Sequence, residues 1–377
     1  MSSLEEQITE VEDEIRRTAY NKATQGHIGR LKAKLAVLRI ERETRAKGKG
    51  GGTGYAVRKS GHATVGLVGY PSVGKSTLLN RLTAAESETG AYDFTTLTII
   101  PGMLRWGGAS IQVLDMPGLV PGAARGRGRG REVLSVVRSV DLILFLIDPE
   151  HTDLRALVNE LEGAGVRINQ RPPRVVVQRG ERGGLTISST VKLTHLAGGL
   201  ATQIAREFGL HNGAIVFRED ATADQLIDVL AGNRVYVRAL IAVNKAELLS
   251  PAERERMRAD LKPYEPLYVS ARTGEGVEQL VDRVGEALRF IRIFLKPPGR
   301  PADMDEPLIL RQDDTIGELL RRLPGELDHT FRSAQVWGPS ARFPGQTVGR
   351  DHVLRDEDVV TIVVARGSAR AVAERAV

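Results

Sequence analysis

The sequence predicts an α/β fold with a helical N-terminus, an inserted α+β subdomain and a small, β-rich C-terminal domain. Three observations support this prediction. An apolar run at 63–68 leads through a glycine-rich turn into a helical pattern at 77–82. The segment between Asp148 and Asn244 is too long for one connection in a sheet, which indicates an inserted unit. Pro297-Pro298-Gly299 then separates a last segment of mixed strand and helix character.

The N-terminal region is expected to form two helices that pack as an antiparallel hairpin. Apolar residues recur there at three- and four-residue steps, which places them on one face of each helix. The two sets are Leu4, Ile8, Val11 and Ile15, then Ile28, Leu31, Leu35 and Leu38. Gly26 and Gly29 are interpreted as the turn between the helices. The hairpin is expected to pack against the body of the protein or a partner, and residues 47–54 to form a flexible basic linker.

The strongest motif is the turn at 69–76, which reads Gly-Tyr-Pro-Ser-Val-Gly-Lys-Ser. Backbone N–H groups of such a turn converge on an anion, and the positive end of the following helix reinforces them. Lys75 is expected to reach the β and γ phosphates, and Ser76 to bind Mg²⁺ through its hydroxyl. The predicted contacts are Gly69, Tyr70, Pro71, Ser72, Val73, Gly74, Lys75, Ser76 and Thr77. The chain is therefore predicted to bind a nucleoside triphosphate.

A second motif, Asp115-Met116-Pro117-Gly118, ends the strand-like segment 111–114. In P-loop proteins a carboxylate at this place holds Mg²⁺ through water, and the glycine N–H meets the γ-phosphate. We therefore add Asp115, Pro117 and Gly118 to the predicted site. On its own, Asp-x-Pro-Gly would be a plain turn.

With these motifs the chain resembles the developmentally regulated GTP-binding (DRG) proteins of the Obg-like GTPases, in an archaeal form. The resemblance is nearly full length. Besides the two motifs above, it is carried by Asp93-Phe94-Thr95-Thr96-Leu97-Thr98, residues 220–228, residues 232–236, Val336-Trp337-Gly338 and residues 348–352. It implies a P-loop GTPase that hydrolyses GTP to GDP and phosphate and acts as a translation-associated switch on ribosomes. It also implies a ubiquitin-like β-grasp (TGS) domain at the C-terminus, and the family pairs with a dedicated partner protein in eukaryotes.

Two further segments resemble the elements with which GTPases read guanine. They are Asn244, Lys245 and Glu247 after one strand, and Ser270, Ala271 and Arg272 after a shorter one. Asn244 and a backbone N–H near Ala271 would meet N7 and O6, and Lys245 would lie along the base and ribose. Glu247 stands where GTPases usually have Asp, and a misplaced hydrogen bond in a closed site costs about 1–3 kcal/mol. An ATP-preferring relative therefore remains the alternative.

The resemblance also supplies the catalytic candidates Lys75, Thr96 and Gly118. Thr96 is preferred to Thr95 as the switch threonine that would join Ser76 and Asp115 around Mg²⁺. Leu119 stands where small GTPases have a water-orienting glutamine, which predicts slow intrinsic hydrolysis. Some relatives use K⁺ instead, anchored by an asparagine whose place Ser72 takes here, so K⁺ stimulation is a hypothesis. The arginine–glycine run at 125–131 is read as a mobile loop, or as a contact to ribosomal RNA or the γ-phosphate.

Composition limits the remaining possibilities. The 377 residues suffice for two or three domains, and there is no cysteine to form a disulfide or a thiolate zinc site. No apolar run could span a membrane and no signal segment opens the chain, so a cytoplasmic protein is expected. The formal charge of +6 favours RNA or ribosome surfaces. A monomer without sequence-specific DNA binding is expected, and a non-catalytic RNA-binding scaffold is the third hypothesis.

The predicted boundaries follow from these elements. Residues 1–54 hold the hairpin and linker, 55–290 the GTPase domain with its insertion at about 167–238, 291–367 the TGS domain, and 368–377 a flexible tail. Strands are expected in the insertion at 174–178, 185–193 and 215–218, and helices at 202–208 and 223–230. The C-terminal domain is expected to have strands at 307–310, 334–337 and 358–364, and a helix at 315–322.

Overall fold

The computed structural model of the chain describes residues 3–19, 21, 24–47, 60–83, 100–116, 134–196, 199–262, 264–323 and 330–364. The chain divides into two compact units. The first comprises Met1–Ala56 and Leu161–Val237, and the second comprises Val57–Glu160 and Arg238–Val377. Each unit therefore combines two separate stretches of the sequence.

The second unit is centred on a sheet with the strand order β10-β9-β4-β1-β3-β2. β5 (Val166–Ile168) belongs to the first unit, where it pairs with the first residues of β9, 235–237. The parallel strands of the central sheet are β1 (Ala63–Gly69), β3 (Ala109–Asp115), β4 (Leu142–Ile147), β9 (Val235–Val243) and β10 (Leu267–Tyr268), and β2 (Ile100–Trp106) is antiparallel to β3. Every residue of β1 and β4 is buried, as expected for parallel strands covered on both faces. The carboxyl ends of β1, β3, β4 and β9 therefore meet at one edge of the sheet, where ligands bind in open α/β folds.

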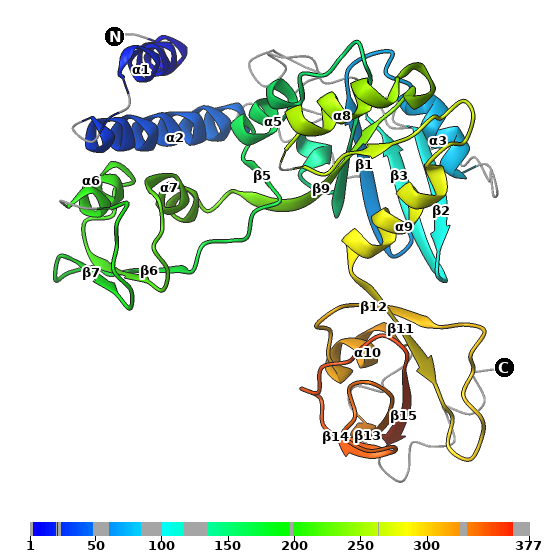
Figure 1. Cartoon of the computed structure of the whole chain (residues 1–377). Coiled ribbons are helices and arrows are strands. Elements are labelled where there is room, and N and C mark those ends of the chain that lie inside the picture. The colour runs from blue at the N-terminus through cyan, green and yellow to red at the C-terminus, as the bar shows by residue number, and fades with distance from the viewer. Residues whose placement is uncertain are drawn as a thin grey trace. The chain divides into compact units, whose positions relative to one another are not determined.

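Helices complete this part of the second unit: α3 (Lys75–Thr83), α5 (Leu154–Gly163), α8 (Pro251–Asp260) and α9 (Val277–Leu288). In α9, Leu280, Val284 and Leu288 recur every four residues and pack into the core on one side of the sheet. Gly285, on the same helix, lies against the Trp106 ring, where a Cβ atom would come within 2.2 Å of ring carbons. The sheet and its helices form the predicted P-loop nucleotide-binding fold (Figure 1).

The C-terminal part of the second unit is a five-stranded sheet covered by one helix. The strand order is β12-β11-β15-β13-β14, with β11 (Phe290–Leu295), β12 (Leu308–Arg311), β13 (Phe331–Trp337), β14 (Gln346–Val348) and β15 (Asp358–Val364). Buried Ile316, Leu319 and Leu320 of α10 (Ile316–Arg322) pack on it. The predicted β-grasp fold is confirmed, although the sequence analysis assigned no strand to β11 or β14.

The first unit begins with the predicted helical hairpin of α1 (Leu4–Arg17) and α2 (Gln25–Lys47). Ser3 caps α1, and Ile8 and Val11 pack with Leu31 and Leu38 of α2. The predicted turn was wrong, because Gly26 and Gly29 both lie inside α2. The chain turns instead around Asn21 and Thr24, whose side chains each accept a hydrogen bond from the other's backbone N–H.

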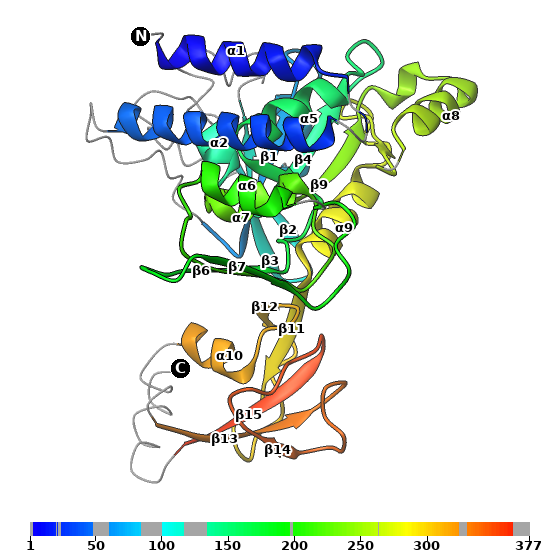
Figure 2. The same ribbon diagram turned by 90° about the vertical axis from the view of Figure 1, so that its left-hand side faces the viewer.

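The hairpin packs on the inserted subdomain. The insertion contains β6 (Val175–Arg179), β7 (Leu185–Ser189), β8 (Gly213–Phe217), α6 (Leu200–Glu207) and α7 (Ala223–Ala231), with strand order β6-β8-β7. Figures 1 and 2 show α6 and α7 between α2 and this small sheet. Ala33 and Ala36 of α2 share one buried core with the insertion, and Lys32 pairs with Asp224 at 2.8 Å. A Cβ on Gly29 would lie 3.2 Å from Leu200, so this glycine permits close packing of α2 on α6.

Among the described helices, none is both long and apolar enough to cross a bilayer.

Candidate functional site

The phosphate-binding turn joins β1 to α3 and depends on two close backbone approaches. A Cβ on Gly69 would lie 2.2 Å from the Leu146 carbonyl oxygen, and one on Gly74 would lie 2.4 Å from Asn244 Nδ2. Gly74 has φ +91°, and Ser72 also adopts a left-handed φ of 65°. Val73 is buried, whereas Pro71, Ser72, Ser76 and Thr77 are exposed. The loop thus packs closely against Leu146 and Asn244 at its two glycines, while its outer side chains face solvent.

Lys75, Ser76 and Asp115 come together at the start of α3. The Lys75 ammonium donates to the carbonyl oxygens of Gly69 at 3.3 Å and Tyr70 at 2.9 Å, and it forms no ion pair with a carboxylate in the described chain. Burial lowers the Lys75 pKa, and the charge of Asp115 opposes this effect. Ser76 Oγ donates to Asp115 Oδ2 at 2.5 Å. The Lys75 ammonium is therefore suited to bind a phosphate chain. The neighbouring oxygens of Ser76 and Asp115 are suited to bind a hard metal ion such as Mg²⁺.

Asn244 ties the phosphate-binding turn to the loop that follows β10. Its side chain is buried, its Nδ2 donates to the Val73 carbonyl at 2.8 Å, and its Oδ1 accepts from the Ala271 N–H at 2.9 Å. The Ala271 N–H, which we expected near guanine O6, is therefore engaged with Asn244. Arg81 of α3 braces the same loop by donating to the carbonyl oxygens of Ala271 and Arg272 at 3.2 and 2.5 Å.

Glu247 lies beside this loop. Its Oε1 is 3.4 Å from Arg272 Nε, and its Oε2 is buried without a hydrogen-bond partner among the described residues. Although burial opposes it, the Ser270 hydroxyl and Arg272 lower the pKa of Glu247, so the carboxylate is ionised at neutral pH. A buried, unpaired carboxylate oxygen is costly unless a donor reaches it. The residue is therefore suited to accept hydrogen bonds from a ligand.

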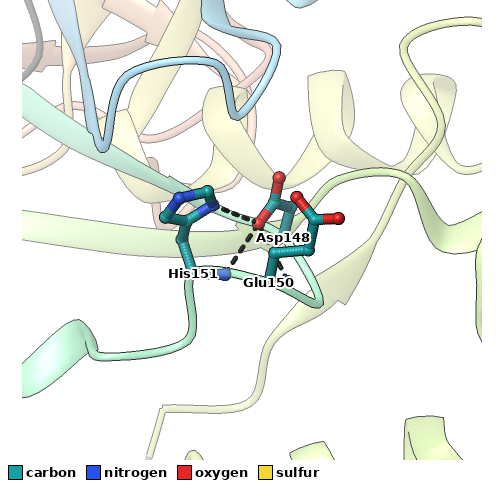
Figure 3. A group of neighbouring side chains, drawn as sticks. All are labelled: Asp148, Glu150 and His151. Carbon is teal, nitrogen blue, oxygen red and sulfur yellow. Dashed lines mark hydrogen bonds and ion pairs between the residues drawn. The ribbon is translucent and has the colours of Figure 1, made fainter.

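A cluster at the end of β4 was not predicted from the sequence. Asp148 is fully buried, and its Oδ1 accepts from the backbone N–H groups of Glu150 and His151 and from the His151 ring (Figure 3). Its Oδ2 lies 2.5 Å from the Lys245 ammonium. The His151 ring stacks on Tyr70 of the phosphate-binding turn, with 5.7 Å between ring centroids. A polar residue directly after the apolar strand 142–147 was the available signal, since such residues collect at the binding edge of a parallel sheet.

Several predicted residues fall outside the described part of the chain. They are Thr95, Thr96, Pro117 and Gly118, together with Leu119 and the arginine–glycine run at 125–131. The same holds for residues 48–54 of the linker and for the C-terminal tail.

Three known protein families match successive parts of the chain. Residues 64–179 match the family described as 50S ribosome-binding GTPase, residues 182–290 match the C-terminal region of that GTPase domain, and residues 291–364 match the TGS domain. The family match at the C-terminus agrees with the β-grasp fold of β11–β15.

Full-length relatives share this arrangement. A GTP-binding protein of Methanocaldococcus jannaschii is 51% identical over 96% of this chain and 93% of its own length. Developmentally-regulated G-protein 3 of Arabidopsis thaliana is 44% identical over 96% of this chain and 99% of its own. Ribosome-interacting GTPase 1 of Saccharomyces cerevisiae is 42% identical over 96% of this chain and all of its own. With such identity along its whole length, the chain belongs to the developmentally regulated G-protein family of GTP-binding proteins.

Proposed function

We propose that the site at the carboxyl edge of the β1–β3–β4–β9 sheet binds GTP and hydrolyses it to GDP and phosphate as a molecular switch. One observation carries the assignment. The buried Asn244 amide holds the phosphate-binding turn at Val73 and the base-side loop at Ala271, so the two halves of a nucleotide pocket are fixed together. Family membership supports the same activity.

Each residue then has a specific role. The turn at 69–77 surrounds the phosphates with backbone N–H groups, and the Lys75 ammonium stabilises the negative charge that develops as water attacks the γ-phosphorus in line. Thr96, Pro117 and Gly118 are proposed to contact the nucleotide, Thr96 and Gly118 at the γ-phosphate. Loss of the γ-phosphate would release both segments, which is the switch.

Ser76 and Asp115 are proposed to hold Mg²⁺, with Thr96, or Thr95 in its place, as the additional ligand. The adjacent Ser76 hydroxyl and Asp115 carboxylate in this structure are the oxygen donors that Mg²⁺ prefers. When bound, the ion neutralises charge on the β and γ phosphates.

Guanine is proposed as the base. The Oε2 of Glu247, which has no hydrogen-bond partner in the described part of the chain, supplies an acceptor for the guanine N1–H and N2–H donors, which adenine lacks on that edge. Asn244 and the segment Ser270–Arg272 would line the other edge, and Lys245 would lie along the base.

The first experiment measures binding of fluorescent GTP, GDP and ATP, followed by phosphate release under multiple-turnover conditions. We expect GTP and GDP to bind more tightly than ATP, and Lys75→Ala to abolish phosphate release. Tighter binding of ATP would support an ATP-preferring protein. Nucleotide binding without phosphate release, even with ribosomes and K⁺ present, would support a non-catalytic scaffold.

The rate is proposed to be slow without an activator, because Leu119 can neither donate to nor accept from the attacking water. K⁺ is proposed to stimulate the reaction near the exposed Ser72. Turnover is compared in KCl and NaCl at equal ionic strength, and equal rates would rule out the K⁺ hypothesis.

The ribosome is proposed as the partner, and the cytoplasm as the compartment in which the two meet. The yeast relative is named for interaction with ribosomes, and the matched GTPase family is described as ribosome-binding. The net charge of +6 favours contact with RNA phosphates.

We further propose that the chain is a monomer that joins a family partner protein. Sedimentation with ribosomes in GDP and in a non-hydrolysable GTP analogue tests the switch, because equal sedimentation in both nucleotides would contradict it.

A further inference from the structure

The buried carboxylate of Asp148 has no role in the function proposed above, although it touches two parts of the nucleotide site. A fully buried carboxylate is expensive to keep charged unless it is paired and hydrogen-bonded. Burial raises the pKa of Asp148, but the ion pair with Lys245 and the hydrogen bonds from His151 more than offset it and lower the pKa overall. The group is therefore a fixed negative charge at neutral pH, and its two oxygens serve different partners.

The first partner is Lys245. Its ammonium is 2.5 Å from Asp148 Oδ2, its side chain is 30% exposed, and its backbone is left-handed with a φ of 57°. The head of the side chain is thus anchored while part of the stem remains accessible. Ordering a free lysine side chain on binding costs conformational entropy. Because the ion pair orders it before a ligand arrives, binding loses less entropy.

The second partner is His151. Since a carboxylate only accepts hydrogen bonds, the His151 Nδ1 at 3.0 Å from Asp148 Oδ1 carries the proton between them. The imidazole plane is then fixed, and it lies at 28° to the ring of Tyr70. The Tyr70 hydroxyl donates to the Asp153 carbonyl at 3.0 Å, so the face of this ring and its hydroxyl both contact the segment that follows β4.

We propose that Asp148 is a positioning residue of the nucleotide site: it fixes Lys245 for contact with base and ribose and, through His151, supports the Tyr70 side of the phosphate-binding turn. This inference depends on the proposed GTP site. The carboxylate is expected to affect nucleotide affinity and not the chemical step, because neither Lys245 nor the Tyr70 side chain is assigned to the γ-phosphate.

A metal site is the competing interpretation of the same residues. Asp148, Glu150 and His151 offer ligand atoms within 4.8 Å of one another (Figure 3). However, the Lys245 ammonium already contacts Asp148 Oδ2, and the His151 Nδ1–H points at Asp148 Oδ1. A positive charge and a proton thus occupy the positions that a cation would need. Glu150, which is exposed, separates the two interpretations because only a metal site would require it.

The test uses the full-length protein and the variant Asp148→Asn. The amide keeps an oxygen for the two backbone N–H groups but turns an N–H group toward the ammonium, so Lys245 must move. We expect the Kd of GDP and of a GTP analogue to rise together by about tenfold, with kcat at saturating GTP unchanged. A change in kcat with unchanged affinity would overturn the proposal.

Glu150→Gln is the matched control, since it makes the same chemical change two residues away. We expect affinity within about twofold of the wild type, measured with and without a chelator of transition metals. An equal loss in both variants, together with chelator sensitivity of the wild type, would assign a metal site instead.

A double-mutant cycle distinguishes positioning from loss of fold. Lys245→Met removes the ammonium and keeps the aliphatic stem. In this background Asp148→Asn should no longer lower nucleotide affinity through Lys245. Only the smaller part that acts through His151 should remain, and it should match His151→Phe. A full tenfold loss in the K245M background would overturn the role of Asp148 toward Lys245. If the wild type itself fails to bind GTP, the proposed function fails, whereas a wild-type protein that binds GTP with an unaffected D148N variant refutes this inference alone.

Discussion

Replacing Gly74 by alanine should break the junction between the phosphate-binding turn and Asn244. Gly74 has φ +91°, and an added Cβ would lie 2.4 Å from Asn244 Nδ2. Contacts below 3.0 Å are essentially never seen for a Cβ, so the amide must retreat by about 0.6 Å or more. The same amide holds bonds of 2.8 Å to Val73 and 2.9 Å to Ala271, and it has no room to keep both.

Two costs add in this variant. The left-handed backbone costs an alanine about 1–2 kcal/mol relative to glycine. Displacing the Asn244 amide adds about 1–3 kcal/mol to the loss of stability, because the buried Val73 carbonyl or Ala271 N–H is left without a hydrogen bond. Gly274→Ala is the control, since its φ is +93° but its Cβ would meet only the end of the Arg81 side chain at 3.7 Å or more. It should show the backbone cost alone.

The assay is thermal unfolding of both variants and the wild type, followed by titration with fluorescent GDP. The additional 1–3 kcal/mol in Gly74→Ala corresponds to a midpoint roughly 2–12 °C below that of Gly274→Ala. Its GDP affinity should also fall, because the phosphate-binding turn and the base-side loop no longer share Asn244. Equal midpoints for the two alanine variants would refute the reasoning.

Three further predictions concern the metal, the base and the core. Ser76→Ala should weaken GTP binding in Mg²⁺ by about tenfold or more and leave binding in excess EDTA unchanged; a similar loss in EDTA would argue against a metal ligand. Glu247→Gln should reduce the preference for GTP over ATP by about ten- to a hundredfold in competition titrations, since hydrogen bonds to charged groups contribute about 1.5–3 kcal/mol; parallel losses for both nucleotides would contradict a base contact. Gly285→Ala should lower unfolding stability by about 1–3 kcal/mol despite the better helix propensity, because the methyl group would overlap Trp106. Gly163→Ala, with open space around it, should be neutral or stabilising, and a loss equal to that of G285A would show that the Trp106 contact is not responsible.

The parts of the site that the sequence predicted are those coded by contiguous residues. A strand, a glycine turn and a helix stand next to one another at 63–82, so the position of Lys75 and Ser76 follows from local pattern. Asp148 and Arg81 were missed because their importance comes from partners that only the fold brings near. Arg81, for example, braces loop residues 190 and 191 positions away.

The difference between local patterns and contacts distant in sequence also explains where the fold prediction was wrong or incomplete. Gly29 was read as a turn residue from its type, but its purpose is to let Leu200 approach, and Leu200 belongs to the insertion. β14 has only three residues, too few to establish a period, and β11 follows directly on the α9 helix with Arg289 alone between them. Periodicity resolved α1 and α2 because each has several turns.

The core shared by α2 and the insertion also constrains how the chain matures. Lys32 and its partner Asp224 are 192 positions apart, so at about 5–20 residues per second the second emerges roughly 10–40 s after the first. During most of that interval the described residues that share a core with Ala33 and Ala36, which lie between Val175 and Leu230, have not yet been synthesised. Biogenesis of the first unit is therefore paced by translation, and a nascent polypeptide stalled before residue 175 would present the uncovered Ala33 and Ala36 face of α2 to chaperones.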